Sequence, residues 1–122
     1  MIAVRVAEHA SDRGSVAAAF RRIPYLIPEM EQLGLPPGVL DLLKLKRGLV
    51  LVTGATGQGK STTLASLLDR MNQERQLHIV TLEDPVEYLF QHKQSIVVQR
   101  EIGIDTISFQ YYQENSPTPV DV

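Results

Sequence analysis

Residues 49–62 of the chain read LVLVTGATGQGKST. The opening LVLVT is a continuous apolar run that ends in Thr53, and such a run is typical of a strand buried on both faces of a parallel sheet. The residues that follow, 54–61, match the pattern G-x-x-x-x-G-K-S/T of the phosphate-binding P-loop. A buried strand that leads into this loop predicts an α/β protein with a nucleotide site.

The residue types of the loop suit a bound phosphate chain. Glycines let the backbone turn its N–H groups toward phosphate oxygens. The Lys60 ammonium adds positive charge, the Ser61 hydroxyl can coordinate Mg²⁺, and a helix beginning at Thr62 would direct its positive dipole end at the anion. The cofactors expected are therefore ATP and Mg²⁺, with Ser61 as the metal ligand. The expected nucleotide-binding residues are Gly54, Ala55, Thr56, Gly57, Gln58, Gly59, Lys60, Ser61 and Thr62.

The residues beyond the loop predict one helix and two more strands. Leu64, Leu67, Leu68 and Met71 recur at the spacing of one helical face. Residues 78–82 read HIVTL and predict a second buried strand, and residues 95–98 predict a third. Because strand, helix and strand follow one another as in a βαβ unit, the predicted class is α/β, with a parallel sheet and flanking helices. This context argues against a glycine-rich turn without a ligand.

Two acidic residues, Glu83 and Asp84, end the second predicted strand and precede Pro85. Open α/β sheets place their ligand groups at the carboxyl ends of strands. On spacing alone, these carboxylates could hold Mg²⁺, could orient an attacking water molecule, or could be solvated side chains at a strand–loop junction. The residues alone do not separate these interpretations.

Composition excludes several functional classes. Twelve basic and 14 acidic residues give a net charge of −2, whereas a sequence-independent nucleic-acid binder needs a basic face. The chain has no cysteine, and its histidines, His9, His78 and His92, show no metal-ligand spacing, which argues against a zinc site. No apolar run reaches the roughly 20 residues that span a bilayer, and no signal peptide is visible. We expect a cytoplasmic protein without nucleic-acid binding or membrane insertion.

The N-terminal part predicts short elements. Residues 4–7 are compatible with a strand, and residues 15–23 fit either a helix or a buried strand. Pro28 favours the start of a short helix that Gly34 ends, and the Pro-Pro pair at 36–37 opens a second helix.

Several segments occur in an order that resembles one protein family. They read RGSV (13–16), FRRIP (20–24), LGLP (33–36), GLVLVTGATGQGKS (48–61), TLEDPVEY (81–88) and QREIGIDT (99–106). Together they resemble the PilT-type ATPases, which retract type IV pili and belong to the type II/IV secretion ATPases. Many families share the P-loop, whereas the acidic segment narrows the match to secretion ATPases. The last segment resembles PilT or its paralogue PilU, and the likeness covers about residues 4–109.

The resemblance implies a RecA-like P-loop core preceded by the tail of a PAS-like domain. Glu83 would lie in the aspartate box of the family and act as the catalytic base, so the Walker B strand would lie further on. Arg13, Arg21 and Arg22 would end the PAS-like domain, where an arginine can reach nucleotide in a hexamer. The implied partners are ATP, other subunits of a homohexamer in full-length relatives, and the pilus platform protein at the cytoplasmic face of the inner membrane.

The chain departs from the family after Phe109. The family continues with a helix rich in Ala, Leu and Arg, whereas residues 110–119 of this chain read QYYQENSPTP. We therefore interpret the sequence as a fragment with residues 1–27 as the remnant of the N-terminal domain and residues 28–47 as connecting helices. Residues 48–109 would be the first part of the ATPase domain, and residues 110–122 a disordered tail.

The expected function is that of the ATP-binding portion of a pilus-retraction motor, inactive alone because Walker B and the C-terminal lobe are missing. One alternative is a small P-loop nucleotide-binding or regulatory protein that docks on pilus or secretion motors without turnover. Another is a relic that has no stable fold.

Overall fold

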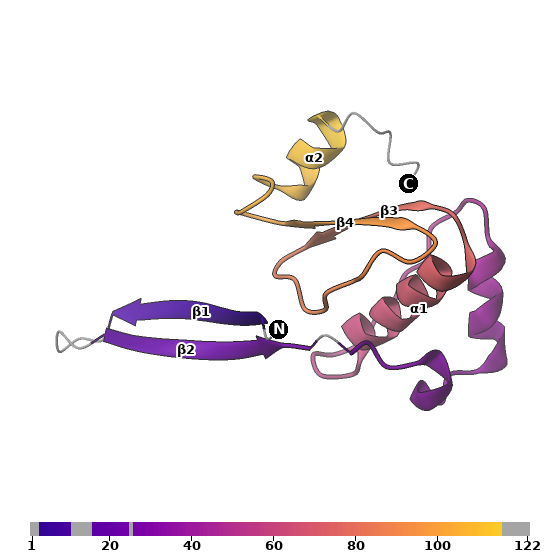
Figure 1. Cartoon of the computed structure of the whole chain (residues 1–122), viewed down its shortest axis with the longest axis horizontal. Coiled ribbons are helices and arrows are strands. Elements are labelled where there is room, and N and C mark those ends of the chain that lie inside the picture. Colours follow the sequence, from indigo (N-terminus) through magenta and orange to yellow (C-terminus); the bar gives the residue numbers. More distant parts are fainter. Residues whose placement is uncertain (1–2, 11–15, 25, 116–122) are drawn as a thin grey trace.

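The computed structural model describes residues 3–10, 16–24 and 26–115, and within them the chain forms two separate two-stranded sheets and several helices (Figure 1). In chain order the elements are β1 (Ala3–Ala10), β2 (Val16–Ile23), the 3-10 helices η1 (Met30–Leu33) and η2 (Pro37–Lys44), α1 (Lys60–Glu74), β3 (His78–Glu83), β4 (Ile96–Glu101) and α2 (Phe109–Asn115). The predicted α/β class is confirmed.

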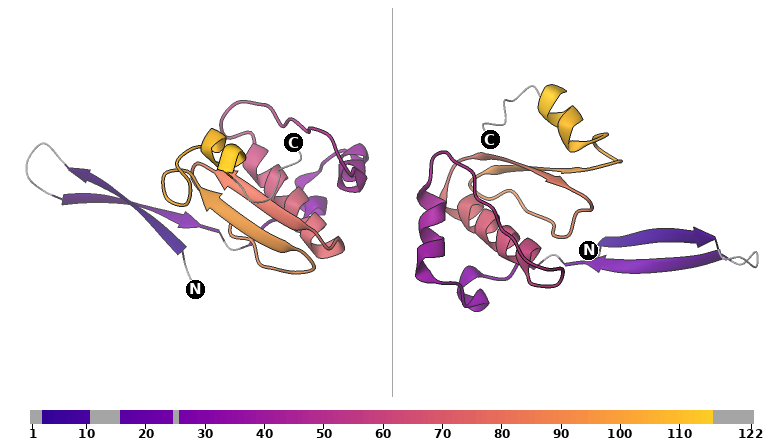
Figure 2. Two further views of the ribbon diagram at one scale, coloured as in Figure 1. Left: turned by 90° about the horizontal axis from the view of Figure 1, so that it is seen from above. Right: turned by 180° about the vertical axis from the view of Figure 1, so that it is seen from behind.

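The strands β1 and β2 form an antiparallel hairpin that projects away from the rest of the chain in every view (Figures 1 and 2). Their register runs from Ala3 opposite Ile23 to Ala10 opposite Val16. The strand expected at residues 4–7 is therefore present, and the ambiguous segment 15–23 is a strand over its described residues.

The core lies where α1 packs against η1 and η2. Met30 of η1, Leu43 of η2 and Leu67 of α1 are buried together. The Ser66 hydroxyl also donates a hydrogen bond to the carbonyl oxygen of Pro28 at 2.6 Å. Both helices predicted between residues 28 and 45 exist as 3-10 helices. These contacts hold η1 and η2 against α1.

The other sheet consists of β3 and β4, which run parallel with His78 opposite Ile96 and Glu83 opposite Glu101. It lies between α1 and α2 (Figures 1 and 2). Both strands were predicted, and the structure confirms them. Their burial is lower than expected, since Ile79 and Val97 are the buried apolar residues of the pair.

A buried amide joins α1 to the loop before β4. Asn72 is 0% exposed, and its Nδ2 donates to the carbonyl oxygen of Gln91 at 2.7 Å. Its Oδ1 accepts from the backbone amides of Lys93 at 3.2 Å and Ser95 at 3.3 Å. The Lys93 ammonium adds an ion pair with Asp69 at 2.7 Å. These contacts fix where β4 begins relative to α1.

The buried strand predicted for residues 49–53 is wrong for this structure. No strand is assigned there among the described residues, and Leu49 is 70% and Leu51 74% exposed. A strand needs a hydrogen-bonding neighbour to be stable. The described strands pair as β3 with β4 and β1 with β2, so none of them is paired with residues 49–53. The segment is nevertheless apolar and leads directly into the P-loop.

The disorder predicted after Phe109 is wrong for the described part of that segment. Residues Phe109–Asn115 form α2, and the side-chain amide of Gln110 donates to the Glu114 carboxylate at 2.8 Å, a contact between neighbouring helical turns. The remaining residues of the predicted tail lie outside the described part of the chain.

Candidate functional site

The P-loop residues 54–59 form the connection into α1. Gly57 and Gly59 have φ angles of 82° and 79°, in the left-handed region that only glycine adopts without strain. Gly59 occupies the position immediately before the first residue of α1. The glycines therefore supply the reversal of backbone direction that the sequence pattern predicts.

The Lys60 side chain folds back over this loop. Its Nζ donates a hydrogen bond to the carbonyl oxygen of Ala55 at 2.9 Å, and the contact is exposed to solvent. Lys60 is also the first residue of α1, two residues before the predicted helix start at Thr62. Because a phosphate oxygen is a stronger acceptor for an ammonium than a neutral carbonyl is, an arriving phosphate can replace this contact.

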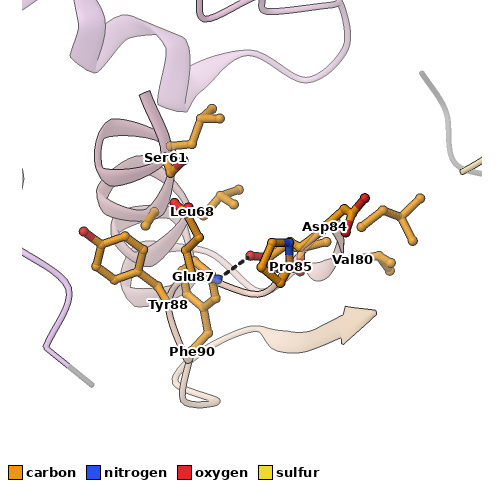
Figure 3. A pocket seen from close by; sticks show the side chains of 13 residues that line it. Ser61, Leu68, Val80, Asp84, Pro85, Glu87, Tyr88 and Phe90 are labelled. Carbon is orange, nitrogen blue, oxygen red and sulfur yellow. Dashed lines mark hydrogen bonds between the residues drawn. The ribbon is translucent and has the colours of Figure 1, made fainter. Parts of the chain in front are cut away.

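A cavity of about 410 Å³ lies between α1 and β3, next to the end of the P-loop (Figure 3). Leu68 and Val80 contribute apolar wall, and the same cavity is lined by three residues whose side chains carry oxygen, Ser61, Glu83 and Asp84. Oxygen donors are the ligands that Mg²⁺ prefers, and the ion usually keeps water and phosphate oxygens as its other ligands. The donor set therefore fits Mg²⁺, although the described residues include no cluster of three or more His, Asp or Glu side chains placed to hold a metal ion.

The Glu83 carboxylate is half-buried and held unevenly. Its Oε1 accepts hydrogen bonds from the Thr81 hydroxyl at 2.7 Å and from Nε2 of Gln99 at 2.9 Å. Its Oε2 faces the backbone amide of Glu87 at 3.4 Å, the contact drawn as a dashed line in Figure 3. One oxygen is thus anchored by two short contacts, and the other is left with a single long one that a water molecule can displace or join.

Gln99 and Tyr88 complete the surroundings of Glu83, and neither was predicted as a site residue. Nε2 of Gln99 also donates to the Tyr88 carbonyl oxygen at 2.7 Å, and its Oε1 accepts from the Phe90 amide at 2.9 Å. The Tyr88 and Thr62 hydroxyl oxygens are 2.9 Å apart. Gln99 belongs to the QREIGIDT segment that carries the family resemblance, so the sequence pointed to this region. Its contact with Glu83 depends on the register that places Gln99 opposite Thr81.

The three candidate arginines belong to the N-terminal part of the chain. Arg13 is outside the described residues, and Arg21 and Arg22 lie on β2, with Arg5 and Val4 as their strand partners.

His78 and His92 lie on or next to the parallel sheet. His78 is exposed at the start of β3, and Nδ1 of His92 accepts a hydrogen bond from the Val97 amide at 3.0 Å. His92 therefore ties its loop to β4.

Comparison with known families identifies the class of protein that this fold and loop define. Residues 19–109 match the family described as "Type II/IV secretion system protein". This match covers well over half of the 122 residues, so the chain belongs to that family. Its end at residue 109 coincides with the predicted end of the resemblance.

Two pilus ATPases are among the similar proteins. The chain is 46% identical over 104 residues to the type IV pilus ATPase PilU of Pseudomonas aeruginosa, covering 85% of this chain and 27% of PilU. It is 46% identical over 105 residues to the type IV pilus retraction ATPase PilT of the same organism, covering 86% of this chain and 30% of PilT. The chain thus spans about a third of the length of these relatives or somewhat less.

A solved structure shows the same fold. The crystal structure of the pilus retraction motor PilT with bound ADP superposes with a TM-score of 0.78 at 51% identity, covering 87% of this chain and 34% of PilT. The predicted P-loop ATPase fold is therefore confirmed. No helix in the described part of the chain is both long and apolar enough to cross a membrane.

Proposed function

We propose that the chain binds ATP with Mg²⁺ through residues 54–62. The observation that carries this proposal is the glycine-rich turn, which leads into the N-terminus of α1 and has the Lys60 ammonium folded over it. Backbone N–H groups at the start of a helix and a nearby ammonium both favour a phosphate chain. Ser61 would contribute an oxygen ligand to Mg²⁺, which neutralises phosphate charge when it is bound.

We further propose that Glu83 acts as a general base in the family's ATPase reaction. Ser61, at the end of the P-loop, and Glu83 line the same cavity, so a phosphate held at Ser61 and a water held at Glu83 can meet there. The weakly bound Oε2 is the atom available to accept a hydrogen bond from that water. Withdrawing a proton during attack is the step that a positioned carboxylate assists.

The biological role proposed is that of part of a pilus-retraction motor ATPase. The support is the identity to PilU and PilT and the structural match to PilT. In this proposal a protein that carries the complete ATPase domain works as a homohexamer on the pilus platform protein, at the cytoplasmic face of the inner membrane. An arginine near β2 would then reach the nucleotide of a neighbouring subunit.

A fluorescent ATP analogue tests the binding part of this proposal. Titration of the chain in the presence of Mg²⁺ should give saturable binding that unlabelled ATP displaces, and chelation of Mg²⁺ should weaken it. A titration without saturation would contradict nucleotide binding. We expect no phosphate release from either a motor fragment or a regulatory protein. The binding signal is therefore the decisive measurement.

A further inference from the structure

Hydrogen bonds at the hydroxyl and at the carbonyl of Tyr88 connect the first turn of α1, by way of Gln99, to the Glu83 carboxylate. This series begins at the Thr62 hydroxyl, 2.9 Å from the Tyr88 hydroxyl. It continues from the Tyr88 carbonyl oxygen, which accepts from Nε2 of Gln99, and ends where that same Nε2 donates to Oε1 of Glu83. Thr62 directly follows Ser61 in the P-loop pattern, so the series starts at the proposed phosphate site.

Tyr88 is bonded at both of its ends. Its ring places the hydroxyl against α1, and its carbonyl oxygen contacts Gln99 on β4. Tyr88 therefore links α1, through its hydroxyl, to β4, through its carbonyl oxygen. Figure 3 shows Tyr88 beside the cavity that Ser61 and Asp84 also line.

The side-chain amide of Gln99 serves three partners at once. An amide nitrogen has two hydrogens, and here one serves the Tyr88 carbonyl while the other serves the Glu83 carboxylate. The amide oxygen is held by the Phe90 backbone at 2.9 Å. The Gln99 amide therefore links the position of the Tyr88 carbonyl to that of the carboxylate oxygen that it holds.

We propose that Gln99 is a positioning residue for Glu83 and that Tyr88 transmits occupancy of the P-loop to it. This inference rests on the proposed function, because it takes the P-loop as the nucleotide site and Glu83 as the base. The arrangement would align Glu83 for attack by water once nucleotide has settled against the first turn of α1. A purely structural clamp would instead hold Glu83 identically with and without nucleotide.

Nuclear magnetic resonance on the whole chain tests this inference. A non-hydrolysable ATP analogue with Mg²⁺ is added to saturation, while the backbone amides of Gly57 and Gly59, the side-chain amide of Gln99 and the carboxyl carbon of Glu83 are followed. Parent, Tyr88→Phe and the control Tyr111→Phe are compared. Tyr88→Phe removes only the hydroxyl, and Tyr111 lies on α2 on the far side of the sheet.

The expected result is that nucleotide shifts all four resonances in the parent and in Tyr111→Phe. In Tyr88→Phe the glycine amides should still shift, whereas the responses of Gln99 and Glu83 should largely disappear. Gln99→Leu, checked for folding by circular dichroism, should likewise abolish the Glu83 response. Full responses at Gln99 and Glu83 in Tyr88→Phe, or glycine shifts without any response at Gln99 in the parent, would overturn the inference alone. No shift of the glycine amides would overturn the proposed function and the inference with it.

Discussion

Replacing Asn72 with alanine should strongly destabilise the chain, because this one amide serves three backbone groups. Its Nδ2 donates to Gln91, and its Oδ1 accepts from Lys93 and Ser95, at 2.7, 3.2 and 3.3 Å. A buried polar group left without a partner costs about 1–3 kcal/mol. The Ser95 amide lies in a buried contact, whereas the other two contacts are partly buried and can regain some water. The expected loss is therefore about 3 kcal/mol in the free energy of unfolding.

Urea denaturation followed by far-ultraviolet circular dichroism measures this loss. Gln76→Ala is the control, since Gln76 is an exposed amide just beyond the end of α1 and surface changes usually stay within about 0.5 kcal/mol. An Asn72→Ala variant as stable as Gln76→Ala would refute the reasoning. It would mean that the loop before β4 is not fixed through Asn72 and that the position of Gln99 is set in another way.

Further predictions concern packing and turnover. Leu67→Ala should lower the free energy of unfolding by about 2–5 kcal/mol, because Leu67 is only 7% exposed. Leu51→Ala should change it by no more than about 0.5 kcal/mol in the same assay, because Leu51 is 74% exposed. A loss for Leu51→Ala as large as that for Leu67→Ala would indicate that residues 49–53 are a buried strand after all. Glutamine at the position of Glu83 in a full-length relative should slow ATP hydrolysis by roughly 10²–10⁴-fold and leave nucleotide binding in place, and an unchanged rate in a phosphate-release assay would exclude the base. The 122-residue chain alone should hydrolyse ATP negligibly, and P-loop-dependent turnover comparable to that of a full-length motor would contradict this.

Sequence patterns predicted the elements that are determined locally. The glycines at 57 and 59 and the helix that begins at Lys60 depend on near neighbours in the chain, and the structure contains each of them. The predicted strand from His78 is also present, and there β4 supplies the pairing partner. The extended run at residues 49–53 carried an equally strong strand signal. It failed as a prediction because strand formation depends on a pairing partner, which a hydrophobic pattern cannot supply.

The surroundings of Glu83 could not be read from spacing. Its place at a strand end made Glu83 a candidate, and the family resemblance implied its role as a base. Gln99 contacts it only because β3 and β4 pair with Thr81 opposite Gln99. Similarly, Tyr88 reaches Thr62 across 26 positions in the chain. Contacts of this kind arise from register and packing, so they required the structure.

The most direct test of nucleotide binding at the P-loop is isothermal titration calorimetry of ATP with Mg²⁺ on three proteins. These are the parent chain, Lys60→Ala and Lys46→Ala, in which an exposed lysine outside the loop is removed. A hydrogen bond to a charged group contributes about 1.5–3 kcal/mol, so Lys60→Ala should raise the dissociation constant roughly 10- to 100-fold. Lys46→Ala should bind as the parent does. Equal affinity of the parent and Lys60→Ala would contradict phosphate binding at this loop.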